Sequence, residues 1–219
     1  MVNLYVLDTN IREGFDFQKL YNKLPDYRKA KINKIKFQED KILSLGAGLL
    51  TKHILTINNL NDINIKFINN GKPVVEGLFF NISHSGKYVI CAVADKAVGV
   101  DIEKISEYNE NIPKRFFARK ECEYLSAQPE ADKNKEFFRI WTIKESYIKM
   151  TGEGISCGLD SFWVDFTKDT EIYRNINNTP LKQECYIYEF PFKEYCCSIC
   201  SEDDKLNSNI NYMKFSDFI

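Results

Sequence analysis

Two acidic residues follow each other at strand spacing in the run Gly99-Val100-Asp101-Ile102-Glu103. Side chains alternate between the two faces of a strand, so Asp101 and Glu103 point to the same side. Two carboxylates this close repel each other unless a positive charge lies between them. The pattern fits a cation site, but it also fits a strand that runs out into a polar loop where Lys104 neutralises the charge.

A second candidate is the run from Trp141 to Lys149, in which Trp141, Glu145 and Lys149 recur every four residues. In a helix these three side chains share one stripe. A Glu-to-Lys pair at this spacing is a common surface feature worth only ~0.3–0.5 kcal/mol. The surrounding helix is crowded with aromatic and aliphatic residues, however, which favours a cleft-facing position for Glu145 and Lys149.

Phosphate-binding chemistry is suggested by Asn81-Ile82-Ser83-His84-Ser85-Gly86, where two hydroxyls flank a histidine. Such a turn can hold a phosphate with hydroxyls and backbone N–H groups, although a plain polar turn is an equal alternative. A one-signed basic run near residues 28–36 is either a solvated helix face or an anion site. Carboxylates that bind Mg²⁺ beside cations that bind phosphate together indicate a ligand with more than one phosphate group.

Other kinds of site are poorly supported. Cys197-x-x-Cys200 lacks a second pair at zinc-site spacing, and no nucleophile-elbow spacing accompanies a serine. The seven cysteines are typical of reduced thiols in the cytoplasm. With 30 basic and 31 acidic residues the net charge is −1, which excludes a generally basic nucleic-acid binder. We expect neither a membrane span nor a signal peptide, and hence a cytoplasmic protein.

Hydrophobic periodicity orders these motifs along the chain. Helix-like stretches precede strand-like stretches twice, near residues 38–102 and 133–200, which predicts an α+β fold of two similar lobes packed side by side. We place the lobes at residues 1–102 and 103–219. The expected helices cover residues 16–37 (with a second helix starting at Pro25), 38–56, 113–126 and 133–151. The expected strands cover residues 4–7, 89–94, 98–102, 162–166, 185–188 and 195–200. We expect the strands at 89–94 and 98–102 to pair as a hairpin.

The motifs resemble those of the surfactin-type 4′-phosphopantetheinyl transferases. The family signature pairs [IV]-G-[IV]-D, here Val98 to Asp101, with [FW]-[STC]-x-K-E-[SA]-x-x-K, here Trp141 to Lys149. Further matches are Gly71-Lys72-Pro73, Phe80 to Ser85, Arg115-Phe116-Phe117 and Gly152-x-Gly154. The resemblance covers nearly the whole chain in order, and the length is similar to that of the two-lobed, pseudo-twofold, monomeric branch.

The resemblance implies an enzyme that moves the phosphopantetheine arm of coenzyme A to a serine of an apo acyl or peptidyl carrier protein and releases adenosine 3′,5′-bisphosphate. It implies Mg²⁺, with Mn²⁺ as a possible substitute, and no nucleic-acid or membrane partner. A coenzyme A binder without turnover and a Mg²⁺-dependent phosphohydrolase are the alternatives. By the same resemblance, the metal is held by Asp101, Glu103 and Glu145, and Lys149 neutralises the pyrophosphate. The 3′-phosphate is bound by Arg28, Lys31 and His84, with Ser83 nearby. The adenine side is lined by Gly71, Lys72 and Pro73, and Ser44 is a weaker match.

Two points stay open at this stage. The carrier serine needs a proton acceptor, and Glu145 or Glu121 could serve, directly or through a metal-bound water. Lys114-Arg115 and Arg119-Lys120 form either a carrier-docking patch or a solvated helix face. Arg28 stands where the family usually has lysine, and it keeps the charge.

Overall fold

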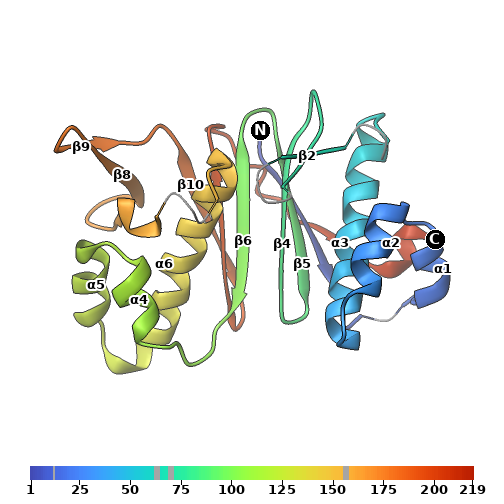
Figure 1. Cartoon of the computed structure of the whole chain (residues 1–219), viewed down its shortest axis with the longest axis horizontal. Helices are drawn as coiled ribbons and strands as arrows, with labels where there is room; N and C mark the ends of the chain where they lie inside the picture. The colour runs from blue at the N-terminus through green and yellow to red at the C-terminus, as the bar shows by residue number, and fades with distance from the viewer. Residues whose placement is uncertain (12, 62–64, 69–71, 155–157) are drawn as a thin grey trace.

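The computed structural model describes residues 1–219 except 12, 62–64, 69–71 and 155–157. Two units lie side by side, so that a long helix covers the outer face of each sheet and the two sheets face each other in the middle (Figure 1). This arrangement confirms the expected α+β fold of two similar lobes.

The first unit consists of β1 (Asn3–Asp8), α3 (Gln38–Ile57), β4 (Phe79–Ser85) and β5 (Tyr88–Ala94). Strand β5 lies in the centre of the sheet and pairs antiparallel with both β1 and β4. Helices α1 (Phe17–Asn22) and α2 (Asp26–Asn33) pack against α3, and the hairpin of β2 (Lys66–Ile68) and β3 (Lys72–Val74) precedes β4.

The second unit repeats this order with β6 (Val98–Lys104), α6 (Glu130–Thr151), β10 (Tyr186–Phe192) and β11 (Tyr195–Ser201). Its last strand, β11, again lies between the other two and pairs antiparallel with both. The additions are α4 (Asn111–Phe116), α5 (Arg119–Ser126), the 3-10 helix η3 (Leu159–Ser161) and the sheet of β7 (Phe162–Asp165), β8 (Glu171–Ile176) and β9 (Thr179–Lys182).

The C-terminal segment returns to the first unit. Strand β12 (Asn211–Met213) pairs parallel with β1, and the 3-10 helix η4 (Phe215–Phe218) contacts α3. The boundary expected at residue 102 therefore cuts through β6, and the last part of the expected second lobe extends the sheet of the first.

The expected hairpin of residues 89–94 and 98–102 is wrong. Strand β5 pairs with β1 and β4, whereas β6 pairs with β11 in the other sheet. Both strands are apolar at most positions, because each packs one face against a helix and the other against the opposite sheet. The short link at Asp95 to Ala97 carries the chain from one sheet to the other instead of closing a ladder.

Local chemistry explains where the expected helices break. As expected, the stretch from 16 to 37 forms two helices, α1 and α2, because Pro25 is the N-cap residue of α2 and cannot continue the preceding helix. The stretch from 113 to 126 splits into α4 and α5 at Phe117 and Ala118, both of extended conformation. Among the described residues, no helix combines the length and the apolar composition that crossing a membrane requires.

The sheets are joined by a core of alternating side chains. Leu4 and Val6 of β1 and Ile90 of β5 face Val100 and Ile102 of β6, and all five are fully buried. The rim of this interface, where β4 approaches β6, is polar instead, and it positions the candidate site.

Candidate functional site between the two units

A glycine in β6 brings the candidate residues together. A Cβ added to Gly99 would lie 2.0 Å from the Ser146 carbonyl oxygen and 2.4 Å from the Met150 nitrogen, so no other residue leaves room for the α6 backbone here. This close approach lays the last turns of α6 along β6. As a result, Lys149 reaches Asp101, two residues beyond Gly99.

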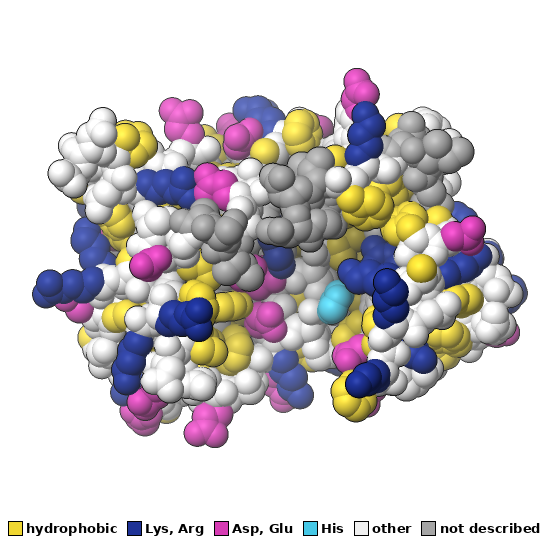
Figure 2. Space-filling model, in the orientation of Figure 1, with side chains coloured by type: hydrophobic (Ala, Val, Ile, Leu, Met, Phe, Trp, Pro, Cys, Tyr) yellow, Lys and Arg dark blue, Asp and Glu magenta, His cyan; other side chains and the backbone are white. Residues whose placement is uncertain are grey.

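The residues of the two signature motifs line one cavity. It has a volume of about 380 Å³ and is bordered by Ile82, Ser83, His84, Asp101, Glu103, Trp141, Glu145 and Lys149. On the face drawn in Figure 2, acidic side chains near the middle lie opposite a histidine and a group of basic side chains. The cavity therefore combines groups from β4 of the first unit with groups from β6 and α6 of the second.

Asp101 is the most restricted of the three carboxylates. It is 2 % exposed, and its Oδ1 accepts hydrogen bonds from Lys149 Nζ at 2.5 Å and Ser83 Oγ at 2.7 Å. Its Oδ2 is buried and has no hydrogen-bond partner among the described residues. A buried carboxylate oxygen without a partner is costly, and a bound cation would satisfy it.

Burial and neighbouring carboxylates raise the pKa values of both Glu103 and Glu145. Burial and, to a smaller extent, the charge of Asp101 raise the pKa of Glu103 above its ordinary value. The hydrogen bond from Ser85 and the charge of Lys149 oppose this rise without cancelling it. Burial also raises the pKa of Glu145; Lys149 opposes this, while Asp101 and Glu103 add to it. Three carboxylates with one ammonium group leave an excess of negative charge, which fits a divalent cation.

The carboxylates do not form a closed metal cage by themselves. Within the described ranges, no three acidic, histidine or cysteine side chains are close enough together to hold an ion. Mg²⁺ commonly binds to one or two carboxylates and completes its shell with water and substrate phosphates. An open set of carboxylates beside a cavity is thus compatible with Mg²⁺ but not with a structural metal.

Of the residues expected to bind the 3′-phosphate, His84 lines the cavity, whereas Arg28 and Lys31 of α2 are not among its lining residues. The pKa of His84 is lowered chiefly by burial and then by the charges of Lys31, Lys149 and Arg28, so these four groups share one field. Burial and then Arg28 lower the pKa of Lys31, and burial lowers that of Arg28. Clustered cations of this kind create a positive potential that attracts anions.

A second glycine positions Arg28. A Cβ at Gly48 of α3 would lie 2.9 Å from the Arg28 Cγ, so the arginine stem packs directly over this glycine. Arg28 Nε and the Ser44 hydroxyl, both buried, have no hydrogen-bond partner in the part of the chain that the structure describes. Buried donors of this kind indicate a polar ligand that would satisfy them.

The expected adenine-side residues are only partly described. Pro73 in β3 is half-buried and opposite Phe67, whose ring lies 5.1 Å from that of Tyr27. Gly71 lies outside the described residues, and for Lys72 the structure describes the backbone alone.

Strand β4 separates the hydroxyls from the histidine. The run from Asn81 to Ser85 is a regular strand, not a polar turn, so alternate residues face opposite sides. His84 faces the cations of α2, whereas the Ser83 and Ser85 hydroxyls donate to Asp101 and Glu103. Ser83 lines the same cavity as His84, although its hydroxyl bonds to Asp101. The contact of Ser85 with Glu103 was missed, although alternation from Ser83 gives the signal for it.

Glu121 does not belong to the cavity. It is fully buried, and its two oxygens accept hydrogen bonds from Lys144 Nζ at 2.7 and 2.8 Å and from the backbone nitrogens of Val164 and Ala118. Lys144 is equally buried and also donates to the Phe162 carbonyl. Of the two proton acceptors that the sequence left open, Glu121 is disfavoured, because both its oxygens accept hydrogen bonds and it does not line the cavity.

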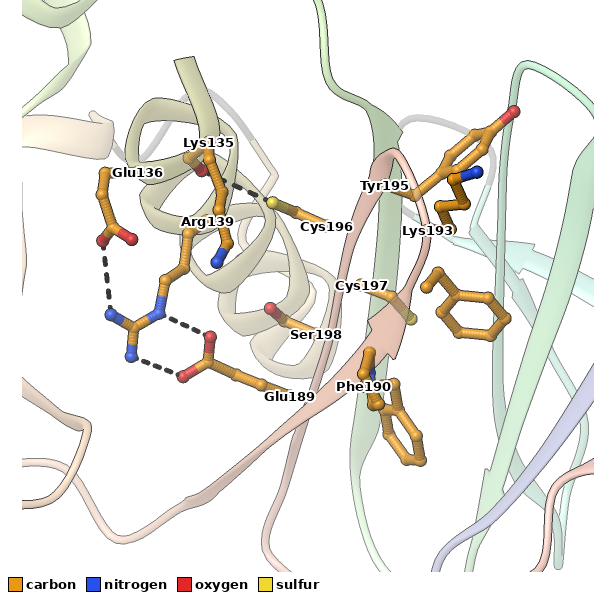
Figure 3. A pocket seen from close by; sticks show the side chains of 12 residues that line it. Lys135, Glu136, Arg139, Glu189, Phe190, Lys193, Tyr195, Cys196, Cys197 and Ser198 are labelled. Atoms are coloured by element: carbon orange, nitrogen blue, oxygen red, sulfur yellow. Dashed lines mark hydrogen bonds and ion pairs between the residues drawn. The ribbon is translucent and has the colours of Figure 1, made fainter. Parts of the chain in front are cut away.

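A larger cavity of about 630 Å³ lies next to α6, between its first half and the β10–β11 hairpin (Figure 3). Its principal cation, Arg139, is already held by both oxygens of Glu189 at 2.6 and 2.8 Å and by Glu136 at 3.3 Å. None of the expected site residues lines this cavity. The smaller cavity is therefore the candidate site.

Comparisons with known proteins point the same way. The family described as the 4′-phosphopantetheinyl transferase superfamily matches residues 97–200, and the family described as 4′-phosphopantetheinyl transferase, N-terminal, matches residues 13–96. A solved holo-[acyl-carrier-protein] synthase from Thermotoga maritima covers 48 % of this chain and 61 % of its own, at 12 % identity and a TM-score of 0.35, a likeness too weak to bear on the fold.

Curated relatives carry the assignment. The chain is 40 % identical over 162 residues to the 4′-phosphopantetheinyl transferase gsp of Aneurinibacillus migulanus, which covers 72 % of this chain and 67 % of the relative. It is 29 % identical over 199 residues to the 4′-phosphopantetheinyl transferase Sfp of Bacillus subtilis (strain 168), over 88 % of both chains. Together with the shared motifs in one cavity, these matches show that the chain is an enzyme of the surfactin-type 4′-phosphopantetheinyl transferase family.

Proposed function

We propose that this enzyme transfers the phosphopantetheine arm from coenzyme A to the serine of an apo carrier protein and releases adenosine 3′,5′-bisphosphate. The observation that carries the proposal is the distribution of charge around one cavity: carboxylates of the second unit line it, and His84 at its edge lies in the field of Arg28 and Lys31 of the first unit. A diphosphate ester with a separate 3′-phosphate has the charge and length to occupy both sides. Family membership supports the transfer, and the site chemistry supports the donor.

Asp101, Glu103 and Glu145 would hold Mg²⁺, or Mn²⁺ in its place. When bound, the ion would neutralise charge on the pyrophosphate and on the leaving phosphate. The unpartnered Oδ2 of Asp101 and the raised pKa values of Glu103 and Glu145 support this role. Lys149 would add a second positive charge beside the same phosphates.

The donor would be fixed at its other end by Arg28, Lys31 and His84, which bind the 3′-phosphate, with Ser44 satisfied by the same ligand. Gly71, Lys72 and Pro73 would line the adenine side. Binding energy from this distant part of the donor can position the pyrophosphate for attack.

In the transfer step, the carrier serine oxygen forms a bond to the β-phosphorus of coenzyme A. The bond from that phosphorus to the bridging oxygen breaks, and adenosine 3′,5′-bisphosphate leaves with the electron pair. Glu145 is the group we assign to accept the serine proton, directly or through a water. It lines the cavity, and its raised pKa suits a proton acceptor near neutral pH.

The carrier would dock on the second unit, where Lys114, Arg115, Arg119 and Lys120 are exposed on α4 and α5. This basic patch suits an acidic carrier surface. We also propose a cytoplasmic monomer, because the six described cysteines are free thiols and one chain supplies all the residues that line the cavity.

The test is to incubate the enzyme with coenzyme A, Mg²⁺ and an apo carrier domain, and then to measure the carrier by intact-mass spectrometry. A mass gain of one phosphopantetheine group supports the transfer. Coenzyme A binding without a mass gain on any carrier would favour a binding protein, and bisphosphate release without a carrier would favour a hydrolase.

Asp101→Asn and Glu145→Gln keep the size of the side chains and remove the charge. We expect each to lower the transfer rate at least ~100-fold, as removal of charge that stabilises the transition state typically does. Ser126→Ala, which removes an exposed hydroxyl on α5, is the matched control. A full Mg²⁺-dependent rate in either carboxylate variant would refute the metal assignment.

A further inference from the structure

Strands β4 and β6 belong to different sheets, yet they are linked by a regular ladder of side chains, which we call the β4–β6 seam. The backbone nitrogen of Val100 donates to Asn81 Oδ1 at 3.0 Å, that of Ile102 to Ser83 Oγ at 3.5 Å, and that of Lys104 to Ser85 Oγ at 3.1 Å. The partners are always 19 residues apart, so the strands run parallel. Side chains of β4 thus take the place of a neighbouring strand's carbonyls at the open edge of β6.

The two serines of the seam form a second set of bonds that Asn81 does not. Each accepts from a β6 nitrogen and donates to the preceding carboxylate: Ser83 to Asp101 Oδ1 at 2.7 Å, and Ser85 to Glu103 Oε2 at 2.8 Å. A hydroxyl has one proton and two lone pairs, so it can make both bonds at once. The first unit therefore orients two acidic side chains of the second.

These bonds occupy one oxygen of each carboxylate. Asp101 Oδ2 is buried and has no hydrogen-bond partner among the described residues, because Ser83 bonds to Oδ1. In Glu103, Ser85 bonds to Oε2 and not to Oε1. Hydrogen bonds to the second oxygen of a ligating carboxylate fix its rotamer and direct the remaining oxygen, and their loss typically weakens metal binding 10–100-fold.

We infer that Ser85 is a positioning residue for the divalent cation: it holds Glu103 from across the unit boundary so that the other carboxylate oxygen faces the metal. The inference rests on the proposed function, because it requires a cation at Asp101, Glu103 and Glu145. Ser83 does the same for Asp101, but it also accepts from Lys149 Nζ at 3.3 Å, so Ser85 gives the cleaner test.

The experiment compares Ser85→Ala with Ser85→Thr, which keeps the hydroxyl and suits a strand, and with Asn81→Ala, which breaks the seam without touching a carboxylate. Binding of Mn²⁺ in the presence of coenzyme A is followed by the electron paramagnetic resonance signal of free Mn²⁺. Thermal unfolding and the Mg²⁺ concentration for half-maximal transfer are measured on the same proteins.

We expect Ser85→Ala to weaken Mn²⁺ binding about tenfold and to raise the half-maximal Mg²⁺ concentration by a similar factor, with the saturated rate less affected. Ser85→Thr should restore both values, and Asn81→Ala should lower the melting temperature while Mn²⁺ binding stays within about twofold of the unaltered protein.

Two results would overturn the inference alone: unchanged Mn²⁺ binding in Ser85→Ala, or an equal loss in Asn81→Ala, which would make the seam merely structural. If the unaltered protein bound no Mn²⁺ in the presence of coenzyme A, the metal assignment itself would fail, and this inference with it.

Discussion

The two units share one topology but use glycine in opposite ways. In the first, Gly46 lies in helix α3, where a Cβ would meet Leu7 Cδ2 at 2.9 Å and Val89 Cγ2 at 3.2 Å, both ends of side chains. In the second, Gly99 lies in strand β6, where a Cβ would meet the backbone of α6. The first contact is side-chain packing, whereas the second brings one backbone against another.

The two long helices also differ in what they place beside the sheets. Helix α3 contributes mostly apolar side chains to the core of the first unit. Helix α6 lies so close to β6 that Lys149 and Asp101 form an ion pair at the edge of the cavity. One repeated fold therefore supplies two different halves, and the candidate cavity is lined by residues of both units.

The largest effect should come from Gly99→Ala. The new methyl group would overlap backbone atoms that cannot move without lifting α6, so we expect a loss of about 3 kcal/mol or more in the free energy of unfolding. Gly46→Ala should cost less than ~1 kcal/mol, because side-chain ends can shift and alanine favours the helix. Urea denaturation of both variants tests this, and equal losses would remove the distinction between the units.

Buried charge is a further property of the second unit. Glu121→Gln leaves Lys144 buried without its counter-charge, so we expect a loss of ~3 kcal/mol in the free energy of unfolding. The double variant Glu121→Leu/Lys144→Met should recover most of that stability and keep the transfer rate within about tenfold, because neither residue lines the cavity. If the double variant were stable but inactive, Glu121 or Lys144 would have to take part in the reaction, contrary to this account.

Each unit should also bind one of the two substrates: the first unit coenzyme A, and the second unit the carrier protein. Arg28→Ala or Lys31→Ala should raise the KM for coenzyme A about tenfold, because each removes a charge-assisted contact to phosphate, and leave the KM for the carrier unchanged. Lys114→Glu with Arg115→Glu should do the reverse, raising only the carrier KM. Steady-state kinetics with each substrate varied in turn measures both, and equal effects on both substrates would contradict the division.

The smallest effect should be a pH dependence at His84. Burial and neighbouring cations hold the pKa of His84 below 6.5, so the folded protein keeps this side chain neutral where the unfolded chain would be protonated. Its contribution to stability is present above pH 6.5 and is lost as the pH falls towards the lowered pKa.

A bound phosphate would favour the protonated form of His84. We therefore expect coenzyme A to bind ~threefold more tightly at pH 6 than at pH 8 relative to His84→Gln, in which this part of the dependence should be absent. Calorimetric titration at the two pH values, with the variant as reference, makes the comparison. If the affinity for coenzyme A changed with pH in the same way in the unaltered protein and in His84→Gln, His84 would not contact the phosphates of the donor.

The sequence predicted which residues share a cavity better than it predicted the connections between strands. Helical and strand periodicity, with the family resemblance, indicated that Asp101, Glu103, Glu145 and Lys149 share a site, and they do line one cavity. The prediction that β5 and β6 form a hairpin was wrong, because strand propensity does not distinguish two strands that pair in one sheet from two that pack face to face in separate sheets. The exchange of sheets at Asp95 to Ala97 is a tertiary property.

The misplaced side chains have physical reasons as well. A glutamate in a short helix gives no sign that a lysine 23 residues later will bury with it, so the pairing of Glu121 with Lys144 could not be read from spacing. Ser83 and Ser85 were taken with His84 as one turn, although a period of two separates hydroxyls from histidine once the segment is a strand. Recognising the strand would have directed both hydroxyls to one face.

The most direct test is the dependence of coenzyme A binding on Mg²⁺, measured by isothermal titration calorimetry on the unaltered protein and on Asp101→Asn. If carboxylates of the second unit hold a metal against the donor pyrophosphate, Mg²⁺ should tighten binding at least ~tenfold in the unaltered protein and have no effect in the variant. Equal affinities for the unaltered protein with and without Mg²⁺ would contradict a metal-bridged donor site.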